Sequence, residues 1–512
     1  MLKRFSIHDE RYDRGEGIHF WLQILLFTTI GQLCWNVENQ WFALFLNAKV
    51  TLDVTYTTAM TILSASLTLI SSFLFGTISD REGKRQKFLA LGFILWGFST
   101  ILMYIAEPVA KLGLENSNTS LIVFAGWLVV LIDGIMSFIG SIGYDSAVNV
   151  WINDHTTTKN KGIIGALLGI MPVVATIIGT VAGGAIIGDD KNYLRLFLIM
   201  GIAVILVGVI ALVFTRDKVD LKPHKDGTFM HQLLAPFRFK ELKGMPNMKE
   251  LFFSLATLCV YFISFNFYFV YLGTWAVYRL GFSEFGFGLI EGAGMILGIG
   301  VALPLSKLIS KDKIPLVSFI GIILTIIGLI MIYIFVKDSS DVDGENVFSF
   351  KNALLIVSVF LFGTGEVLMT EACMIWSRGL FPAKARGTFE GVRCIFFVWL
   401  PMLIGTICGD IIIRAYSEHA VDAVTGMAVN IPQQNLFLYA SFVAGAALIP
   451  LFFGAREYNK RIKAKNEALA KGIIDPTLYE SIPVDESGKT YDLATESGEE
   501  LTKEYNTQNE KE

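Results

Sequence analysis

The stretch that decides the fold is residues 54–106, which read VTYTTAMTILSASLTLISSFLFGTISD (54–80), REGKRQK (81–87) and FLALGFILWGFSTILMYIA (88–106). Two long apolar runs flank a short, basic connection. A helix of about 20 apolar residues crosses the roughly 30 Å hydrocarbon core of a bilayer. The stretch therefore predicts two transmembrane helices joined by a tight polar loop.

The same pattern repeats along the whole chain. Of its 512 residues, 53% are apolar and only 17% are charged, whereas a soluble domain has about 25% charged residues. Comparable apolar runs lie at 19–47, 54–78, 86–106, 121–151, 162–188, 194–215, 250–279, 283–308, 314–336, 351–378, 387–414 and 434–455. We therefore predict an all-α membrane protein with twelve transmembrane helices.

The runs divide the chain into five parts. These are a cytoplasmic N-terminus (1–18), a first six-helix bundle (19–215), a basic central loop (216–249), a second six-helix bundle (250–455) and a charged, disordered cytoplasmic tail (456–512). Lys and Arg concentrate in alternate loops, among them the one with Arg81, Lys84 and Arg85, and such loops face the cytoplasm. We therefore expect a multi-pass protein of the plasma membrane with both termini in the cytoplasm.

Two loops in corresponding places share a pattern. Trp151 precedes Lys159-Asn-Lys161-Gly162, and Trp376 precedes Lys384-Ala-Arg386-Gly387, an offset of 376 − 151 = 225 residues at each matched position. Transporters are often built from two related halves. The repeat thus predicts two pseudo-symmetric six-helix bundles. The spacings Gly179-x-x-x-Gly183 and Gly288-x-x-x-Gly292 predict close contacts between helices.

The loop after the second run reads Gly76-Thr-Ile-Ser-Asp80-Arg81-Glu-Gly83-Lys84-Arg85. It resembles the G-x-x-x-D-R-x-G-R-R signature of the major facilitator superfamily, and the resemblance implies that family's fold. Here Asp80 would meet the positive end of the eleventh helix and Arg386, a contact worth about 1 kcal/mol in one transport state. We call this expected contact the latch; its residues are Gly76, Asp80, Arg81, Gly83, Arg85 and Arg386.

Two further stretches resemble the glycoside-pentoside-hexuronide cation symporters: Gly31-Gln-Leu-Cys-Trp35-Asn-Val-Glu38-Asn39-Gln40-Trp41 and Arg386-Gly-Thr-Phe-Glu390-Gly-Val-Arg393. The first also resembles proton-coupled sucrose carriers. The resemblance implies a sugar or glycoside substrate. The sodium ligands of melibiose-type members are not reproduced, because their positions fall on Thr68, Ser72 and near Ser141.

Ionisable groups inside transmembrane helices are costly and are therefore candidates for function. Trp35 and Glu38 share a helical face with Gly31 and Phe42, and an indole beside a carboxylate suits a sugar. The alternative for Glu38 is a structural pairing with another helix. The expected substrate-binding residues are Trp35, Glu38, Asn39, Asp145 and Glu366.

Ionisable groups inside the helices are also candidates for ion coupling and for gating. Desolvation favours a neutral carboxyl group, so Glu38, Asp145 and Glu366 are candidates for coupling to protons. Asp133 and Glu291 fit either a gate or a substrate-binding role. The residues nearer the cytoplasm are expected to form a gate: Glu371, Arg378, Glu390 and Arg393.

The leading hypothesis is a secondary active transporter that moves a sugar or glycoside, coupled to a proton or another cation. A carrier of an amphiphile or drug on the same scaffold, and a non-transporting receptor, are the alternatives. No cofactor, metal site or nucleic-acid partner is expected, and the chain is expected to be a monomer. The sequence lacks a nucleophile elbow or phosphate-binding glycine loop in a credible context, so an enzyme is not expected.

Overall fold

The computed structural model describes residues 12, 15, 17–156, 160–218, 223, 227–234, 247–309, 311–381, 391–417, 419–422 and 424–470. Within this part of the chain, twelve helices are long and apolar enough to cross a bilayer. Their outer faces expose apolar side chains such as Ile199, Ile202 and Leu206 on α10, a surface suited to lipid tails. The predicted twelve-helix membrane fold is confirmed.

Six of these helices come from residues 18–214. In chain order they are α2 (Ile18–Asn36) with η2 (Val37–Phe42) and α3 (Ala43–Lys49); α4 (Val54–Glu82); α5 (Gln86–Leu102) with η3 (Met103–Ile105) and α6 (Ala106–Glu115); α7 (Thr119–Ser141) with η4 (Ile142–Val148) and α8 (Asn149–Asp154); α9 (Lys161–Ile187); and α10 (Tyr193–Phe214). A short helix, α11 (Phe229–Leu233), follows them.

The other six come from residues 248–470. They are α13 (Met248–Thr274) with η6 (Trp275–Arg279); α14 (Glu284–Ser306); α15 (Ile314–Phe335); η7 (Phe350–Asn352) with α16 (Ala353–Gly379); a helix over 391–416 that includes η9 (Ile395–Trp399) and α18 (Leu400–Tyr416); and α19 (Asn435–Ala446) with α20 (Leu448–Ala470).

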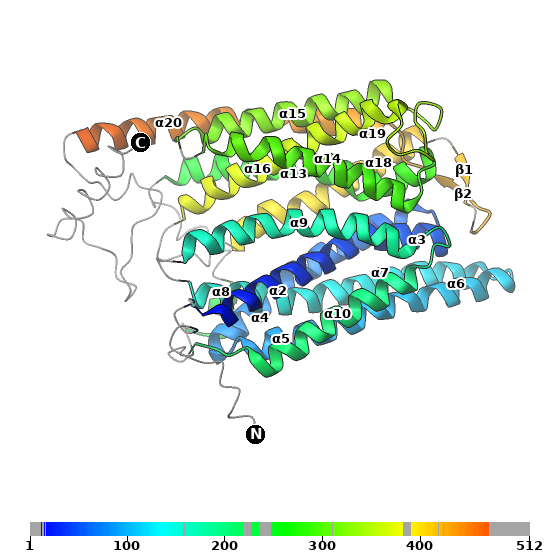
Figure 1. The fold of residues 1–512 in the computed structure, drawn as a ribbon, viewed down its shortest axis with the longest axis horizontal. Helices are drawn as coiled ribbons and strands as arrows, with labels where there is room; N and C mark the ends of the chain where they lie inside the picture. Colours follow the sequence, from blue (N-terminus) through cyan, green and yellow to red (C-terminus); the bar gives the residue numbers. More distant parts are fainter. Residues whose placement is uncertain are drawn as a thin grey trace.

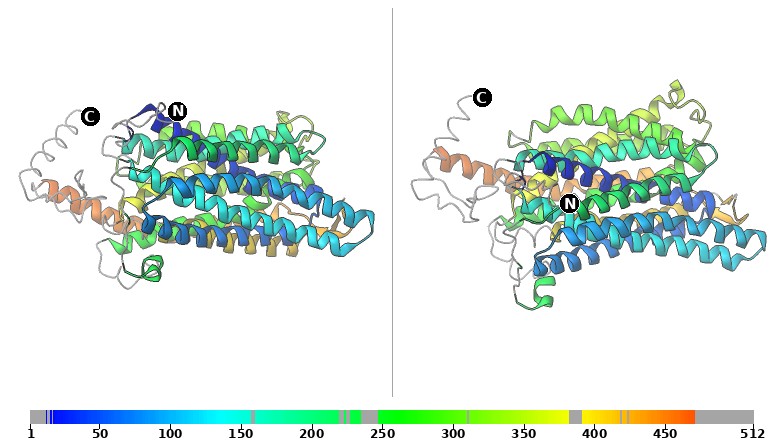
Figure 2. Two further views of the ribbon diagram at one scale, coloured as in Figure 1. Left: turned by 90° about the horizontal axis from the view of Figure 1, so that it is seen from below. Right: turned by 60° about the horizontal axis from the view of Figure 1, so that its bottom comes forward.

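The two sets of helices lie side by side, the first half below the second in Figure 1. The start of α2 and the end of α20 lie at one end of the bundle, which we call the terminal side. A hairpin of β1 (His419–Val421) and β2 (Ala428–Asn430) lies at the other end, the hairpin side. Figure 2 shows the same two ends from other directions, with the short helix α11 (green) beside the bundle at its terminal side.

The repeated tryptophans occupy matching places in the two halves. The indole of Trp151 donates to the backbone oxygen of Arg216 at 2.9 Å, and that of Trp376 donates to the carboxylate of Glu250 at 2.8 Å. Both rings are fully buried. Each therefore ties the fourth helix of its half to a neighbouring helix end on the terminal side.

The last helix extends beyond the predicted end of the membrane bundle. The sequence predicts disorder from residue 456, but α20 continues as a helix to Ala470. Arg461 explains this difference, because its guanidinium donates two hydrogen bonds to buried Glu250 at 2.8 and 3.0 Å. The charged segment is thus anchored to α13. The remainder of the predicted tail lies outside the described residues.

The third helix is also longer than predicted, ending at Glu115 instead of residue 106. Its extension is amphipathic, and Glu107 pairs with Lys111 at 2.7 Å. A prediction based on apolar runs ends a helix at the first such charge, although the helix itself continues through the charged residues.

Candidate functional site

The first membrane helix changes its winding where the candidate substrate residues lie. Residues Val37–Phe42 form a π-helical turn, and Ile142–Val148 in the fourth helix form another. Such turns are uncommon and occur frequently at functional sites. They place Glu38 and Asp145 in wide turns of two neighbouring helices of the first half.

The face that carries Gly31, Trp35, Glu38 and Phe42 turns into the first half of the protein. Gly31 lies against the Tyr144 ring, and the Trp35 ring lies 4.9 Å from that of Trp96. Glu38 accepts a hydrogen bond from Ser137 on α7, and Phe42 contacts Phe197 on α10. The four residues share a face as predicted, but Glu38 packs within its own half and Trp35 stays half-buried.

Asn39, one residue further on, faces the space between the halves. It is exposed although it lies in the middle of a membrane helix. A cavity there is lined by Asn39, Gln40 and Ala43 of the first half and by Phe269, Gly273 and Glu291 of the second. Ala43 and Asn47, one and two turns nearer the hairpin side, are buried. Asn39 is therefore exposed next to this cavity, while the positions on its hairpin side are buried.

The hairpin side of the interface is closed by contacts between the halves. Asn47 donates to Thr274 at 2.6 Å, and Thr58 and Tyr271 share a 2.8 Å hydrogen bond. A Cβ added to Gly288 on α14 would lie 2.6 Å from the backbone oxygen of Thr180 on α9, so these helices touch at their backbones. The structure is a state closed on the hairpin side.

A cluster of carboxylates lies inside the first half. Glu38 is buried and lies within electrostatic range of Asp133 and Asp145. Asp133 accepts from Ser64 on α4. One oxygen of Glu38 and one of Asp133 have no hydrogen-bond partner among the described residues. Two buried carboxylates with free lone pairs form a place where a cation would be stabilised.

Thr68 and Ser72 on α4 lie next to Ser141 on α7. Ser141 shares a 2.9 Å hydrogen bond with Ser72 and donates to the backbone oxygen of Thr68 at 3.2 Å. The same hydroxyl lies 2.7 Å from the carboxylate of Asp145. Among the described residues, Asp145 is thus the only carboxylate that contacts the group formed by Thr68, Ser72 and Ser141.

The second half holds a pair of carboxylates. Glu291 is buried and accepts a hydrogen bond from the Gln40 amide of the other half at 2.7 Å. Glu366 lies within electrostatic range of Glu291, and Tyr268 lies near both. The Gln40 oxygen accepts from Thr180 at 2.7 Å. This amide, which the sequence alone does not distinguish from its neighbours, joins the two halves at mid-membrane.

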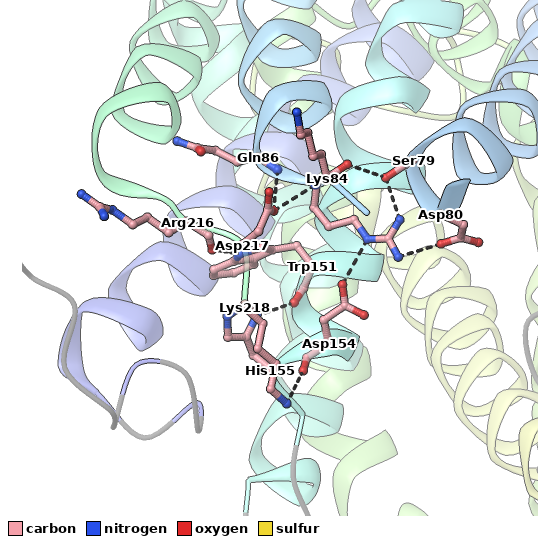
Figure 3. Close-up of polar contacts among 11 residues, drawn as sticks. Ser79, Asp80, Lys84, Gln86, Trp151, Asp154, His155, Arg216, Asp217 and Lys218 are labelled. Carbon is pink, nitrogen blue, oxygen red and sulfur yellow. Dashed lines mark hydrogen bonds and ion pairs between the residues drawn. The ribbon is translucent and has the colours of Figure 1, made fainter. Parts of the chain in front are cut away.

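The signature loop folds around Arg85, and Figure 3 labels the partners Ser79, Asp80, Asp154 and Asp217. The Arg85 guanidinium pairs with Asp80 at 2.7 Å and with Asp154 at 3.1 Å, and it donates to Ser79 at 2.8 Å. The backbone N–H groups of Arg85 and Gln86 donate to Asp217 at 2.9 Å. All these groups belong to the first half or to the segment that follows it directly.

The other signature residues have separate tasks. Gly83 ends α4 in the left-handed region, at φ 64°, where a side chain would be strained. Arg81 donates to the backbone of Gly227 at 3.1 Å and to Gln232 at 3.2 Å, beside α11. The Gly76 position would hold a Cβ at ordinary distance, 3.8 Å, from Ser146. Asp80 pairs with Arg85 here, and the expected partner Arg386 lies outside the described residues.

The expected gate residues on the terminal side are only partly described. Glu371 accepts a hydrogen bond from Ser306, which joins α16 to α14. Arg393 is buried within electrostatic range of Asp145 in the other half. Arg378 is exposed at the end of α16, and Glu390 lies outside the described residues. The structure therefore links Arg393, and not Glu371, to the candidate coupling residues.

A polytopic bundle of two six-helix halves, with a small cavity between them and contacts that close the hairpin side, is the architecture of a membrane transporter. Residues 25–340 match the Major Facilitator Superfamily. This match covers more than half of the chain, so the protein belongs to the Major Facilitator Superfamily. It is a multi-pass membrane transporter and not an enzyme.

Solved structures of similar fold have diverse cargo. A structure of the nucleoside transporter NupG aligns with 13% identity and a TM-score of 0.61, covering 85% of this chain and 99% of NupG. A bacterial homologue of the human lysosomal transporter Spinster, inward-facing and unoccupied, aligns with 15% identity and a TM-score of 0.61, covering 86% and 97%. A POT family transporter in complex with 5-aminolevulinic acid aligns with 16% identity and a TM-score of 0.62, covering 87% and 96%. No curated protein sequence matches this chain.

Proposed function

We propose that this protein moves a sugar or glycoside across the plasma membrane by alternating access, with both termini in the cytoplasm and with proton coupling. The observation that carries the proposal is the exposed Asn39 at mid-membrane, in a cavity that the two halves share. An amide that donates and accepts hydrogen bonds is suited to sugar hydroxyls. The short stretches that resemble glycoside-pentoside-hexuronide symporters support this substrate class.

The aromatic groups near the cavity fit a sugar as well. Trp35 is half-buried beside Asn39, which donates to the Trp35 backbone oxygen at 2.8 Å. Phe269 lines the cavity from the other half. Aromatic faces pack on the C–H face of a pyranose, while the neighbouring polar groups bind its hydroxyls.

In this proposal Glu38 carries the coupling proton. It is buried, it lies near two other carboxylates, Asp133 and Asp145, and one of its oxygens has no described partner. The thiol of Cys34 is a further titratable group nearby. Glu366 beside Glu291 is a second candidate for coupling, in the other half.

Uptake of labelled disaccharides into proteoliposomes tests this proposal. Proton and sodium gradients are imposed in separate experiments, so that the driving ion can be identified. Sodium coupling is not expected, because the sodium ligands of melibiose-type symporters are replaced here by residues with hydroxyl groups. Accumulation driven by the proton gradient is expected, and an Asn39→Ala variant is expected to raise the concentration for half-maximal uptake. Absence of uptake of every glycoside under both gradients would overturn the proposal.

An amphiphilic or drug-like solute is the second candidate. Phe265 and Phe269 stack with ring centroids 4.5 Å apart at half-buried positions in the second half. Such a stack offers an apolar surface opposite Asn39. Saturable transport of an amphiphile, with no glycoside transport, would favour this second function.

A further inference from the structure

The hairpin between the eleventh and twelfth helices contains a buried carboxylate that contacts the other half of the protein. Asp422, which follows β1, is 1% exposed. It accepts hydrogen bonds from the Thr51 hydroxyl at 3.1 Å and from the Leu52 backbone N–H at 3.0 Å. Thr51 and Leu52 form the loop between the first and second membrane helices of the first half.

Groups of the hairpin itself also bind this carboxylate and fix its orientation. The Val424 backbone N–H donates to it at 2.9 Å, and the Thr425 hydroxyl donates to it at 2.7 Å. The backbone of Asp422 also bonds to Gly426 at 2.8 Å and to Met427 at 2.9 Å, which closes the turn. Two donors from each half therefore converge on one side chain, and those of its own half fix its orientation.

We propose that the β1–β2 hairpin is the gate on the hairpin side and that Asp422 closes it by clasping the Thr51–Leu52 loop. A hydrogen bond that water must replace on opening favours the closed contact, by a factor of up to about ten for each bond. Here the two bonds from Thr51 and Leu52 exist only when the halves meet, and opening replaces them with water. The clasp thus favours the state seen here, in which the cavity is closed on the hairpin side.

A neighbouring contact lies on the same edge of the interface. Arg414 at the end of α18 donates to the Thr55 hydroxyl at 2.9 Å and pairs with Asp410 at 2.9 Å. Because this contact is exposed whereas the Asp422 clasp is buried, solvent competes more strongly for the first. Of these two contacts, we therefore assign the larger share of the closure to Asp422.

The test measures opening without any solute, so it does not depend on which solute is carried. Although the proposal rests on alternating access, failure to find a sugar substrate would leave this test intact. An Ala43→Cys reporter is placed in the closed interface, where Ala43 is 4% exposed. In proteoliposomes, a membrane-impermeant maleimide is added from the hairpin side, and the chain with only its native cysteines gives the background rate.

Thr51→Val removes one bond across the interface, and Thr425→Val removes one bond to the same carboxylate within the hairpin. We expect Thr51→Val and Asp422→Ala to raise the labelling rate of the reporter about tenfold, and Thr425→Val to raise it much less. If Asp422→Ala does not fold, the two threonine variants decide alone. Equal labelling rates in these two variants, or no increase with Thr51→Val, would overturn the clasp.

Discussion

The buried ion pair between Arg461 and Glu250 gives a prediction whose size follows from the structure. Both side chains are 3% exposed, and the Glu250 carboxylate accepts three described hydrogen bonds, two from Arg461 and one from Trp376. Arg461→Met would leave this carboxylate buried with a single donor. Removing one partner of a buried pair costs roughly 3–5 kcal/mol. We expect a loss of that order in the free energy of unfolding.

Reversible denaturation in mixed micelles measures this loss, and Arg456→Met is the matched control. Arg456 lies on the same helix but is exposed, so its replacement is expected to change stability by less than about 0.5 kcal/mol. The double variant Glu250→Gln, Arg461→Met is expected to be more stable than Arg461→Met alone, because no buried charge is left unpaired. If Arg461→Met costs no more than Arg456→Met, the anchoring of α20 by this pair is refuted.

Two further predictions concern polar groups outside the carboxylate clusters. Asp217→Ala would remove the acceptor for the backbone N–H groups of Arg85 and Gln86. We expect the free energy of unfolding, measured by the same denaturation, to fall by about 1 kcal/mol. An unchanged free energy would show that this helix cap is dispensable. The pKa of Asp338, in the loop after α15, is lowered because Ser340 donates hydrogen bonds to the carboxylate. The ionised carboxylate therefore orders the loop at neutral pH. This order is lost as the pH falls below the ordinary Asp pKa of about 3.9. Amide hydrogen exchange at Ser340, corrected for its intrinsic pH dependence, should lose protection only in acid; loss of protection near pH 6 would contradict this.

The fold could be predicted from the sequence because the bilayer imposes a length on every apolar run. Helix ends were less predictable, since helical segments that leave the bilayer carry charges, as at Lys111 and Arg461. Lys111 pairs with Glu107 within its own helix, and Arg461 pairs with Glu250 of another helix. An apolar-run criterion contains no such information.

The candidate site was predictable only in part. The stretch from Trp35 to Gln40 was identified, but which side of this helix meets the other half depends on its packing against Tyr144 and Ser137, which are distant in the sequence. Asn39 was among the expected substrate-binding residues, but the sequence did not distinguish it from Trp35 and Glu38 as the one that lines the cavity between the halves. Asp422 gave no local signal, because its partners Thr51 and Leu52 lie 371 and 370 residues away in the chain.

The most direct test of the proposed coupling compares two transport modes in a Glu38→Gln variant. Glutamine mimics a carboxyl group that stays protonated, so the variant should exchange labelled for unlabelled solute across the membrane. It should not accumulate solute under a proton gradient, because that requires release of the proton. Glu467→Gln, an exposed site on α20, should retain both activities.

We predict exchange close to that of the wild-type protein and a loss of proton-driven accumulation in Glu38→Gln. Accumulation equal to that of the wild type and of Glu467→Gln would contradict the assignment of Glu38 as the proton carrier.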